Sequence, residues 1–261
     1  MEDAGEGTTT LKALLIDRPP SPALAATIGT VLGEFWGRLH SWGTSNPALL
    51  EFFTRWTYAR TICAYITYGR LVDTLTGQSA LPALDDPPLG VPAAKLHAIR
   101  ELCALRTAQM EAARQTFVQG DFWPGNLLVR LAPGGGALER IFVVDWEVAR
   151  PGLAGVEVGQ FCAELATVRR FHPPSGEAAA RVLETFLASY FGGLAQLDHA
   201  ETARVALGHF GAHLVAWTPR VPWDGVEKTR AAVMDGVDFL VESYSGKESL
   251  SEGGLIDRFL R

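Results

Sequence analysis

Apolar residues recur at three- and four-residue intervals over most of this 261-residue chain. That spacing places them on one face of an α-helix, so it predicts a largely helical protein. Ser21 followed by Pro22 is a favourable helix start and opens the first long helix. We expect helices near 22–40, 47–75, 93–115, 156–170, 177–196, 199–217 and 224–243.

One stretch in the middle of the chain departs from the helical spacing. Two short apolar runs, 127–131 and 141–144, flank the turn sequence Pro133-Gly134-Gly135-Gly136. Two such runs on either side of glycines predict a β-hairpin. The expected fold class is therefore mainly α with a small β-hairpin, an α+β protein.

The segments outside this pattern suggest the domain organisation. Residues 1–20 are expected to form an irregular entry segment, and 21–244 a helical lobe whose loop and hairpin lie at 117–146. Residues 245–261 are polar and glycine-containing, and are expected to form a loosely held C-terminal tail. Aromatic residues recur along 47–75, and we interpret them as core side chains.

The net charge, the apolar runs and the cysteine count argue against several classes of protein. The formal net charge is −6, which does not favour binding to a nucleic-acid backbone. No run of apolar residues has the length of a membrane-spanning helix, and the acidic N-terminus is unlike a signal peptide. Three cysteines, an odd number without metal-ligand spacing, favour buried thiols in a reducing compartment. We expect a cytoplasmic protein that binds neither membrane nor nucleic acid.

Candidate chemistry gathers around the predicted hairpin. Asp121 follows Gly120 on a tight loop, where a carboxylate can take the proton of an attacking hydroxyl. Asn126 lies five residues later, and Asp145 ends the second strand, so both emerge at the same edge of the hairpin. Amide and carboxylate oxygens suit Mg²⁺. An Asp, an Asn five positions on and a second Asp after a strand form the layout of kinase-type phosphoryl transfer.

Each of these signals has an ordinary explanation. Asp and Asn in a Pro-Gly loop are common turn residues, and a strand can end in Asp by chance. The combination of loop, strand, glycine turn, strand and Asp145-Trp146-Glu147 favours a phosphotransferase-type loop.

The segments 119–128 (QGDFWPGNLL) and 144–147 (VDWE) closely resemble the aminoglycoside phosphotransferase and choline kinase-like family, which has a protein-kinase-like fold. The resemblance implies transfer of the ATP γ-phosphate to a hydroxyl of a small molecule, with ATP and Mg²⁺ as cofactors. It implies that Asp121 is the catalytic base and that Asn126 and Asp145 are the metal ligands. It also implies that Glu2, Asp3 and Ala4 form the hinge that contacts adenine.

The chain departs from the family pattern in three places. Gln119 stands where the family usually has His, although Gln can still donate a hydrogen bond that holds the loop. Glu157 replaces an Asp that we interpret as structural. The chain is expected to begin at the hinge, without the N-terminal lobe and its phosphate-binding lysine. The alternatives are therefore a catalytically weak or inactive pseudokinase-like binding or regulatory protein, or a fragment of a full-length kinase.

Several assignments stay open at this stage. Glu147 lines the cleft or pairs with Arg150, and Trp217, Trp223 and Asp224 form a substrate wall or belong to core and loops. The family resemblance also includes a helix that ends in Leu39-His40, and we interpret His40 as structural. His209 and His213 lie one helical turn apart but lack the Glu of a metalloprotease motif, so we predict no zinc site. The sequence sets neither the acceptor nor the oligomeric state.

Overall fold

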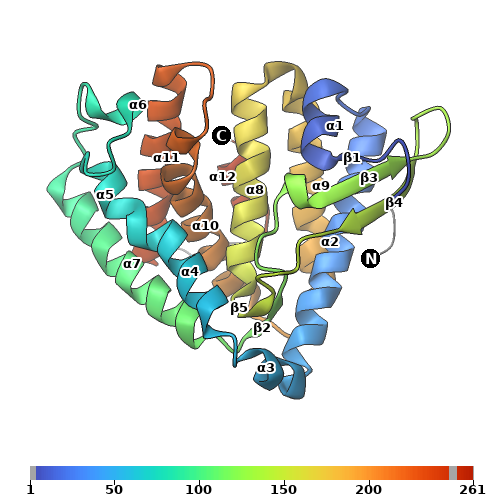
Figure 1. Ribbon diagram of the computed structural model, residues 1–261, viewed down its shortest axis with the longest axis horizontal. Coiled ribbons are helices and arrows are strands. Elements are labelled where there is room, and N and C mark those ends of the chain that lie inside the picture. Colours follow the sequence, from blue (N-terminus) through green and yellow to red (C-terminus); the bar gives the residue numbers. More distant parts are fainter. Residues whose placement is uncertain (1–3, 247–251, 261) are drawn as a thin grey trace.

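The long helices expected from the apolar spacing are present in the computed structural model, which describes residues 4–246 and 252–260 (Figure 1). The expected fold class, mainly α with little β-structure, is confirmed. The long helices are α2 (Pro22–Thr44), α7 (Ala93–Ala112), α8 (Ala154–Phe171), α9 (Gly176–Gly193), α10 (His199–Ala216) and α11 (Val226–Ser245). At the start of α2, the Ser21 hydroxyl accepts a hydrogen bond from the Leu24 amide, as its position predicts.

The N-terminal segment is more ordered than its sequence suggests. Residues Leu11–Asp17 form helix α1, which is capped by the Thr10 hydroxyl. The apolar run in this segment was too short to show helical spacing. The segment 47–75, expected as one helix, is divided into α3 (Pro47–Phe53), α4 (Thr57–Thr67), a 3-10 turn (Tyr68–Arg70) and α5 (Leu71–Leu75). A further short helix, α6 (Pro82–Asp85), lies between the segments 47–75 and 93–115.

The prediction that the aromatic residues of 47–75 belong to the core is wrong for most of them. Phe52, Trp56, Tyr58 and Tyr65 are each more than half exposed, whereas Tyr68 is buried. The physical reason is the division of the helix, since two short helices with different directions do not share one buried face. Tyr58, the most exposed of the four at 78%, lines the cavity described below.

Two small antiparallel sheets complete the fold. The first contains β1 (Thr9–Thr10), β3 (Leu127–Leu131) and β4 (Leu138–Val143), so the expected hairpin gains a third strand. The second pairs β2 (Thr116–Val118) with β5 (Arg150–Gly152). Segment 119–126 connects β2 to β3, and segment 144–149 connects β4 to β5. Each of these segments is therefore anchored at both ends by strand pairing.

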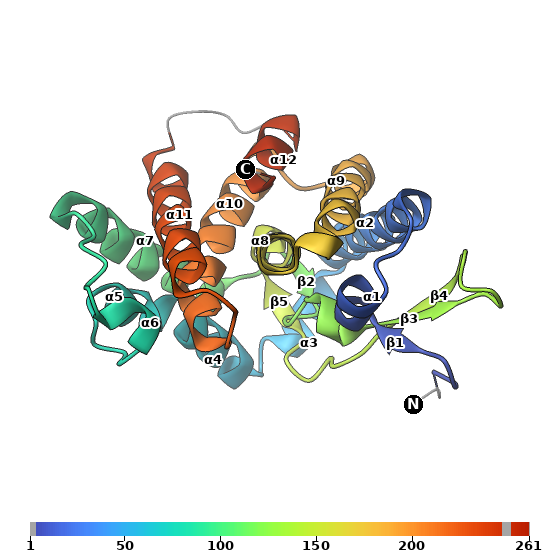
Figure 2. The same cartoon turned by 90° about the horizontal axis from the view of Figure 1, so that it is seen from above.

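Helix α8 stands in the middle of the molecule. In both views, α2 and α9 lie on one side of it, and α10 and α11 lie on the other (Figures 1 and 2). The C-terminal segment adds helix α12 (Glu252–Phe259), which buries Leu255 and Phe259 in the main core. The expectation of a loosely held tail is wrong for these residues, because their apolar side chains are packed. No helix within 4–246 and 252–260 is long and apolar enough to cross a membrane.

Helices α2 and α9 pack so closely that backbone meets backbone. Gly29, Gly33 and Gly37 are spaced four apart on α2 and face α9. A Cβ atom added at Gly33 would lie 2.3 Å from the Phe186 carbonyl oxygen, well inside van der Waals contact. The glycines therefore permit the approach of two helices that carry much of the main core.

We expect Gly33→Ala to lower the free energy of unfolding by about 2 kcal/mol, because the new methyl group forces the two helices apart. Urea denaturation followed by circular dichroism measures the change. Gly192→Ala is the matched control, since Gly192 lies on α9 and has open space around it. It should leave stability unchanged or slightly raised. Equal stability of the two variants would contradict the close-packing argument.

Candidate active site

Strand register brings the three motif residues together. Leu127 pairs with Val143, and the Val144 amide donates to the Asn126 carbonyl at 3.0 Å. Asn126 and Asp145 therefore leave the hairpin at the same edge, as the sequence predicts. Asp121 lies next to Asn126. The side-chain Nδ2 atom of Asn126 donates to both the backbone oxygen and the Oδ2 atom of Asp121, each at 3.0 Å.

Both carboxylate oxygens of Asp121 are held. Oδ2 accepts from Asn126, and Oδ1 accepts from Gln160 Nε2 at 2.8 Å. Each oxygen keeps a further lone pair for a substrate proton. Gln160 comes from α8, about forty positions further along the chain, and it is not among the residues predicted from the sequence. Its only sequence signal is its place three residues after Glu157 on the same helix face.

Gln119 connects the two segments. Its Nε2 atom donates to the carbonyl oxygens of Val144 and Asp145, and its Oε1 atom accepts from the Asp121 amide at 2.7 Å. The prediction that Gln at this position can hold the loop is confirmed. This side chain is fully buried and fixes the segment of Asp121 to that of Asp145.

The arrangement of Asn126 and Asp145 suits a magnesium ion. Because Nδ2 of Asn126 faces the two Asp121 oxygens, its amide oxygen points the other way. Asp145 is exposed and has a left-handed backbone conformation with φ of +62°, unusual for a residue other than glycine. Mg²⁺ uses one or two protein oxygens and fills its remaining positions with waters and phosphates, so this donor set fits. Their role as ligands remains a prediction.

Position 120 has no room for a side chain. Its φ is +97°, and an added Cβ would lie 2.2 Å from Nη1 of Arg150. The buried Arg150 donates to the carbonyl oxygens of Val148 and Gly120, so it binds backbone rather than Glu147. Of the two alternatives for Glu147, the structure supports the cleft, where it lines a cavity.

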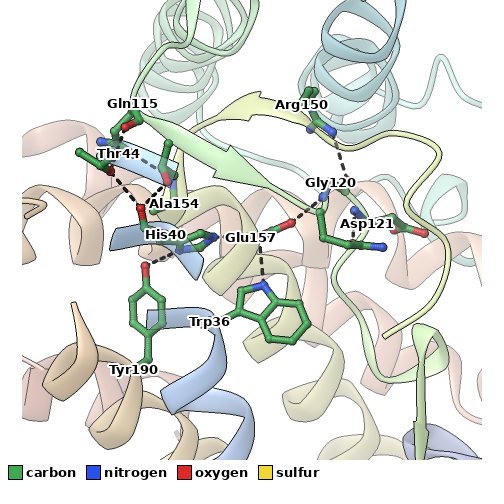
Figure 3. A network of polar contacts seen from close by, with 12 residues as sticks. Trp36, His40, Thr44, Gln115, Gly120, Asp121, Arg150, Ala154, Glu157 and Tyr190 are labelled. Carbon is green, nitrogen blue, oxygen red and sulfur yellow. Dashed lines mark hydrogen bonds and ion pairs between the residues drawn. The ribbon is translucent and has the colours of Figure 1, made fainter. Parts of the chain in front are cut away.

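A buried carboxylate holds the backbone beside Asp121 (Figure 3). Glu157 Oε1 accepts from the Gly120 amide, and Oε2 accepts from Trp36 Nε1 at 3.1 Å and His40 Nε2 at 2.9 Å. Burial, and then the nearby charge of Glu157, raise the pKa of Tyr190 well above its usual value, so its hydroxyl stays protonated. It lies within hydrogen-bond distance of His40 Nδ1, at 2.8 Å. The structural interpretation of His40 and Glu157 is consistent with these bonds.

Aromatic stacking fixes the residue that follows Asp121. The Phe122 ring stacks on Trp36 with centroids 3.7 Å apart and on Phe161 with centroids 4.3 Å apart. Phe122 is fully enclosed between α2 and α8. Asp121 is therefore restrained by Glu157 through Gly120 and by the stacked ring of Phe122.

A cavity of about 360 Å³ opens beside these residues. Its polar lining includes the carboxylates of Asp121, Asp145 and Glu147 together with Arg150, Gln160 and His209, and the rest is largely apolar or aromatic. The apolar and aromatic part includes Tyr58, Ile62, Ile66, Met110 and Trp217. Trp217 thus lines the cavity, one of its two alternatives. The volume lies in the range typical of small-molecule sites.

Lys12 ties α1 to the segment of Asp121. Its ammonium lies 3.3 Å from Glu164 and over the rings of Trp123 and Trp223, at 5.0 and 5.5 Å from their centres. Burial opposes ionisation of Glu164, but the hydrogen bond from His213 and the charges of His213 and Lys12 outweigh it and lower its pKa. Trp223 also stacks on Phe171 and does not line the cavity.

Of the three residues predicted to contact adenine, only Ala4 lies within the described part of the chain. Glu2 and Asp3 lie outside the described residues. The Ala4 carbonyl accepts from the Thr8 hydroxyl at 2.7 Å and from Arg130 at 3.3 Å. Within the described residues, no group of three or more His, Cys, Asp or Glu side chains is arranged to hold a metal ion.

Comparison with known proteins bears on this arrangement. The sequence profile described as the phosphotransferase enzyme family matches residues 6–215. The chain belongs to this family. The expected family membership is thereby confirmed, and the matched region contains Asp121, Asn126 and Asp145.

Two curated relatives are longer than the chain. A 4-hydroxytryptamine kinase of Psilocybe cyanescens is 28% identical over 244 residues, which cover 93% of this chain and 62% of that protein. The protein of the same name from Psilocybe cubensis is 27% identical over 238 residues, or 91% and 61%. The chain thus spans about three fifths of the length of these curated relatives.

Solved structures similar to the chain include two of glucosamine kinase. Crystal form B has a TM-score of 0.46 and 17% identity, covering 92% of this chain and 59% of the other. The complex with glucosamine, ADP and inorganic phosphate has a TM-score of 0.44 and 18% identity, covering 92% and 61%.

We expect Glu157→Gln to lower the free energy of unfolding by about 3 kcal/mol. The carboxylate accepts three N–H groups, whereas an amide has one acceptor oxygen and turns its own NH₂ toward a donor. Thermal and urea denaturation measure the loss. Glu101→Gln, on the exposed face of α7, is the control and should change stability by less than about 0.5 kcal/mol. A Glu157→Gln protein as stable as this control would contradict the proposed anchoring role.

Proposed function

We propose that this chain supplies the chemical part of phosphoryl transfer from ATP to a hydroxyl group of a small molecule. The observation that carries the proposal is the Asp121 carboxylate, held by Gln160 and Asn126 at the edge of a cavity that also contains Asp145. Membership of the phosphotransferase enzyme family supports it. Relatives named 4-hydroxytryptamine kinase support a small acceptor that carries an amine.

In the proposed reaction, Asp121 accepts the proton of the acceptor hydroxyl as the hydroxyl oxygen forms a bond to the γ-phosphorus. The bond between that phosphorus and the β–γ bridging oxygen breaks, and ADP leaves. Asn126 and Asp145 are the proposed ligands of Mg²⁺, which when bound neutralises charge on the phosphates. We assign the adenine contact to the backbone of Glu2, Asp3 and Ala4.

The geometry of the cavity supports this division of roles. The three carboxylates of Asp121, Asp145 and Glu147 outnumber the single arginine, Arg150, in the cavity lining, which favours a cationic group on the acceptor. Tyr58 and Trp217 provide flat surfaces for its apolar part. Gln160 keeps Asp121 oriented, so the proton acceptor does not have to be ordered at the moment of reaction.

Asp121→Ala should reduce transfer at least about a hundredfold while leaving the fold intact, because the base is lost and the loop anchors remain. The measurement is transfer from radiolabelled ATP to a panel of hydroxyl acceptors that includes 4-hydroxytryptamine and glucosamine. Glu101→Ala, an exposed carboxylate on α7, is the control and should keep full activity. Undiminished transfer by Asp121→Ala would remove this residue from the role of base.

Asp145→Ala should abolish the part of ATP binding that depends on Mg²⁺, since one of two proposed ligands is lost. Titration calorimetry of the folded chain with ATP, with and without Mg²⁺, measures this binding. A folded wild-type chain that binds no ATP under either condition would favour the binding or regulatory alternative. Identical Mg²⁺-dependent binding in wild type and Asp145→Ala would reject Asp145 as a ligand.

A further inference from the structure

His209 presents one ring nitrogen to the cavity. The residue lies on α10, is 2% exposed and lines the cavity that contains Asp121. Its Nδ1 atom lies 3.1 Å from the hydroxyl oxygen of Tyr68. Its Nε2 atom has no hydrogen-bond partner among the described residues. It is nevertheless not closed off from solvent, unlike the side-chain nitrogens in that part of the chain that are both unpartnered and fully buried. Nε2 therefore reaches the cavity space.

The surroundings of Tyr68 determine which nitrogen of His209 carries the proton. Burial raises the pKa of Tyr68, and the adjacent Arg106 charge only partly offsets this, so the phenol stays protonated. Arg106 has only donor groups and cannot accept the phenolic proton. Among the residues that the structure describes, His209 Nδ1 is the acceptor that remains. The hydrogen of a neutral His209 ring is consequently on Nε2, the atom that faces the cavity.

His209 also stays neutral. Burial, and then the charges of His213, Arg106 and Arg150, hold its pKa well below the usual value. The structure contains a second tyrosine–histidine pair, in which the Tyr190 hydroxyl oxygen lies 2.8 Å from Nδ1 of His40. There the Nε2–H group donates to Glu157. At His209 the corresponding Nε2–H group has no acceptor within residues 4–246 and 252–260, and it faces the cavity.

We propose that His209 is a specificity-determining residue whose Nε2–H donates a hydrogen bond to a second, uncharged oxygen of the acceptor molecule, distinct from the hydroxyl that is phosphorylated. This inference rests on the proposed function, which puts the reacting hydroxyl at Asp121. An ammonium group cannot accept this hydrogen bond, and the nearby positive charges of Arg106 and Arg150 disfavour it there. A carboxylate is disfavoured by Asp121, Asp145 and Glu147. A hydroxyl, ether or carbonyl oxygen satisfies the donor.

The first test does not depend on catalysis. Long-range nitrogen-15 NMR of the histidine-labelled full chain reports the protonation of each ring, and His209→Gln assigns the His209 signals. We expect a neutral ring with hydrogen on Nε2 between about pH 5 and 8. Tyr68→Phe should shift this ring toward the other tautomer, whereas the matched variant Tyr190→Phe should alter His40 and leave His209 unchanged. A charged His209, or hydrogen on Nδ1 in the wild type, overturns the proposal.

The second test uses two probes that differ in one atom. 2-(2-Aminoethoxy)ethanol carries an ether oxygen where 5-amino-1-pentanol has a methylene group. At tens of millimolar, the ether probe should move the His209 Nε2 resonance more than its partner does. Equal effects, or no effect of either probe, overturn the proposal.

Transfer kinetics separate this inference from the proposed function. Where both probes are phosphorylated, kcat/KM for the ether should exceed that for the methylene compound about three- to tenfold, through KM, and His209→Gln should reduce that preference. The ratio is internal to each variant, so partial unfolding does not alter it. If neither probe is phosphorylated but the NMR results are as expected, the proposed function fails and the role of His209 does not. If both probes are phosphorylated with equal kcat/KM, the proposed role of His209 is overturned.

Discussion

The site depends on the three hydrogen bonds that the buried carboxylate of Glu157 accepts. This carboxylate accepts hydrogen bonds from Gly120 in the segment of Asp121 and from Trp36 and His40 on α2, while its own backbone belongs to α8. A charged group is buried at low cost only when its lone pairs are satisfied, and here three donors satisfy them. The position of Asp121 thus depends on the packing of α2 and α8 as well as on its own loop.

The local part of the site could be predicted from the sequence because it depends on nearby residues. Asn126 and Asp145 flank one hairpin, and pairing of its strands necessarily brings them to one edge. Gln160 and His209 could not be predicted in the same way, since they reach the cavity from α8 and α10. Their contribution depends on how these helices are rotated against each other, which apolar spacing alone does not determine.

The same distinction explains the errors in the fold. The long helices have enough turns for their spacing to be read, whereas β1, β2 and β5 contain two or three residues each and leave no pattern. The aromatic residues of α3 and α4 looked like core because their intervals are helical. Spacing shows that side chains share a face, but it does not show whether that face meets protein or solvent, and Tyr58 meets the cavity and solvent.

The backbone of Asp145 has a consequence for how this protein can change over time. Its left-handed conformation costs an Asp residue roughly 1 kcal/mol that a glycine would not lose. Selection for thermal stability alone would therefore favour glycine at this position and discard the carboxylate. A lineage that keeps Asp145 has a less stable protein, so retention of this residue among close relatives would indicate selection for the function of the site.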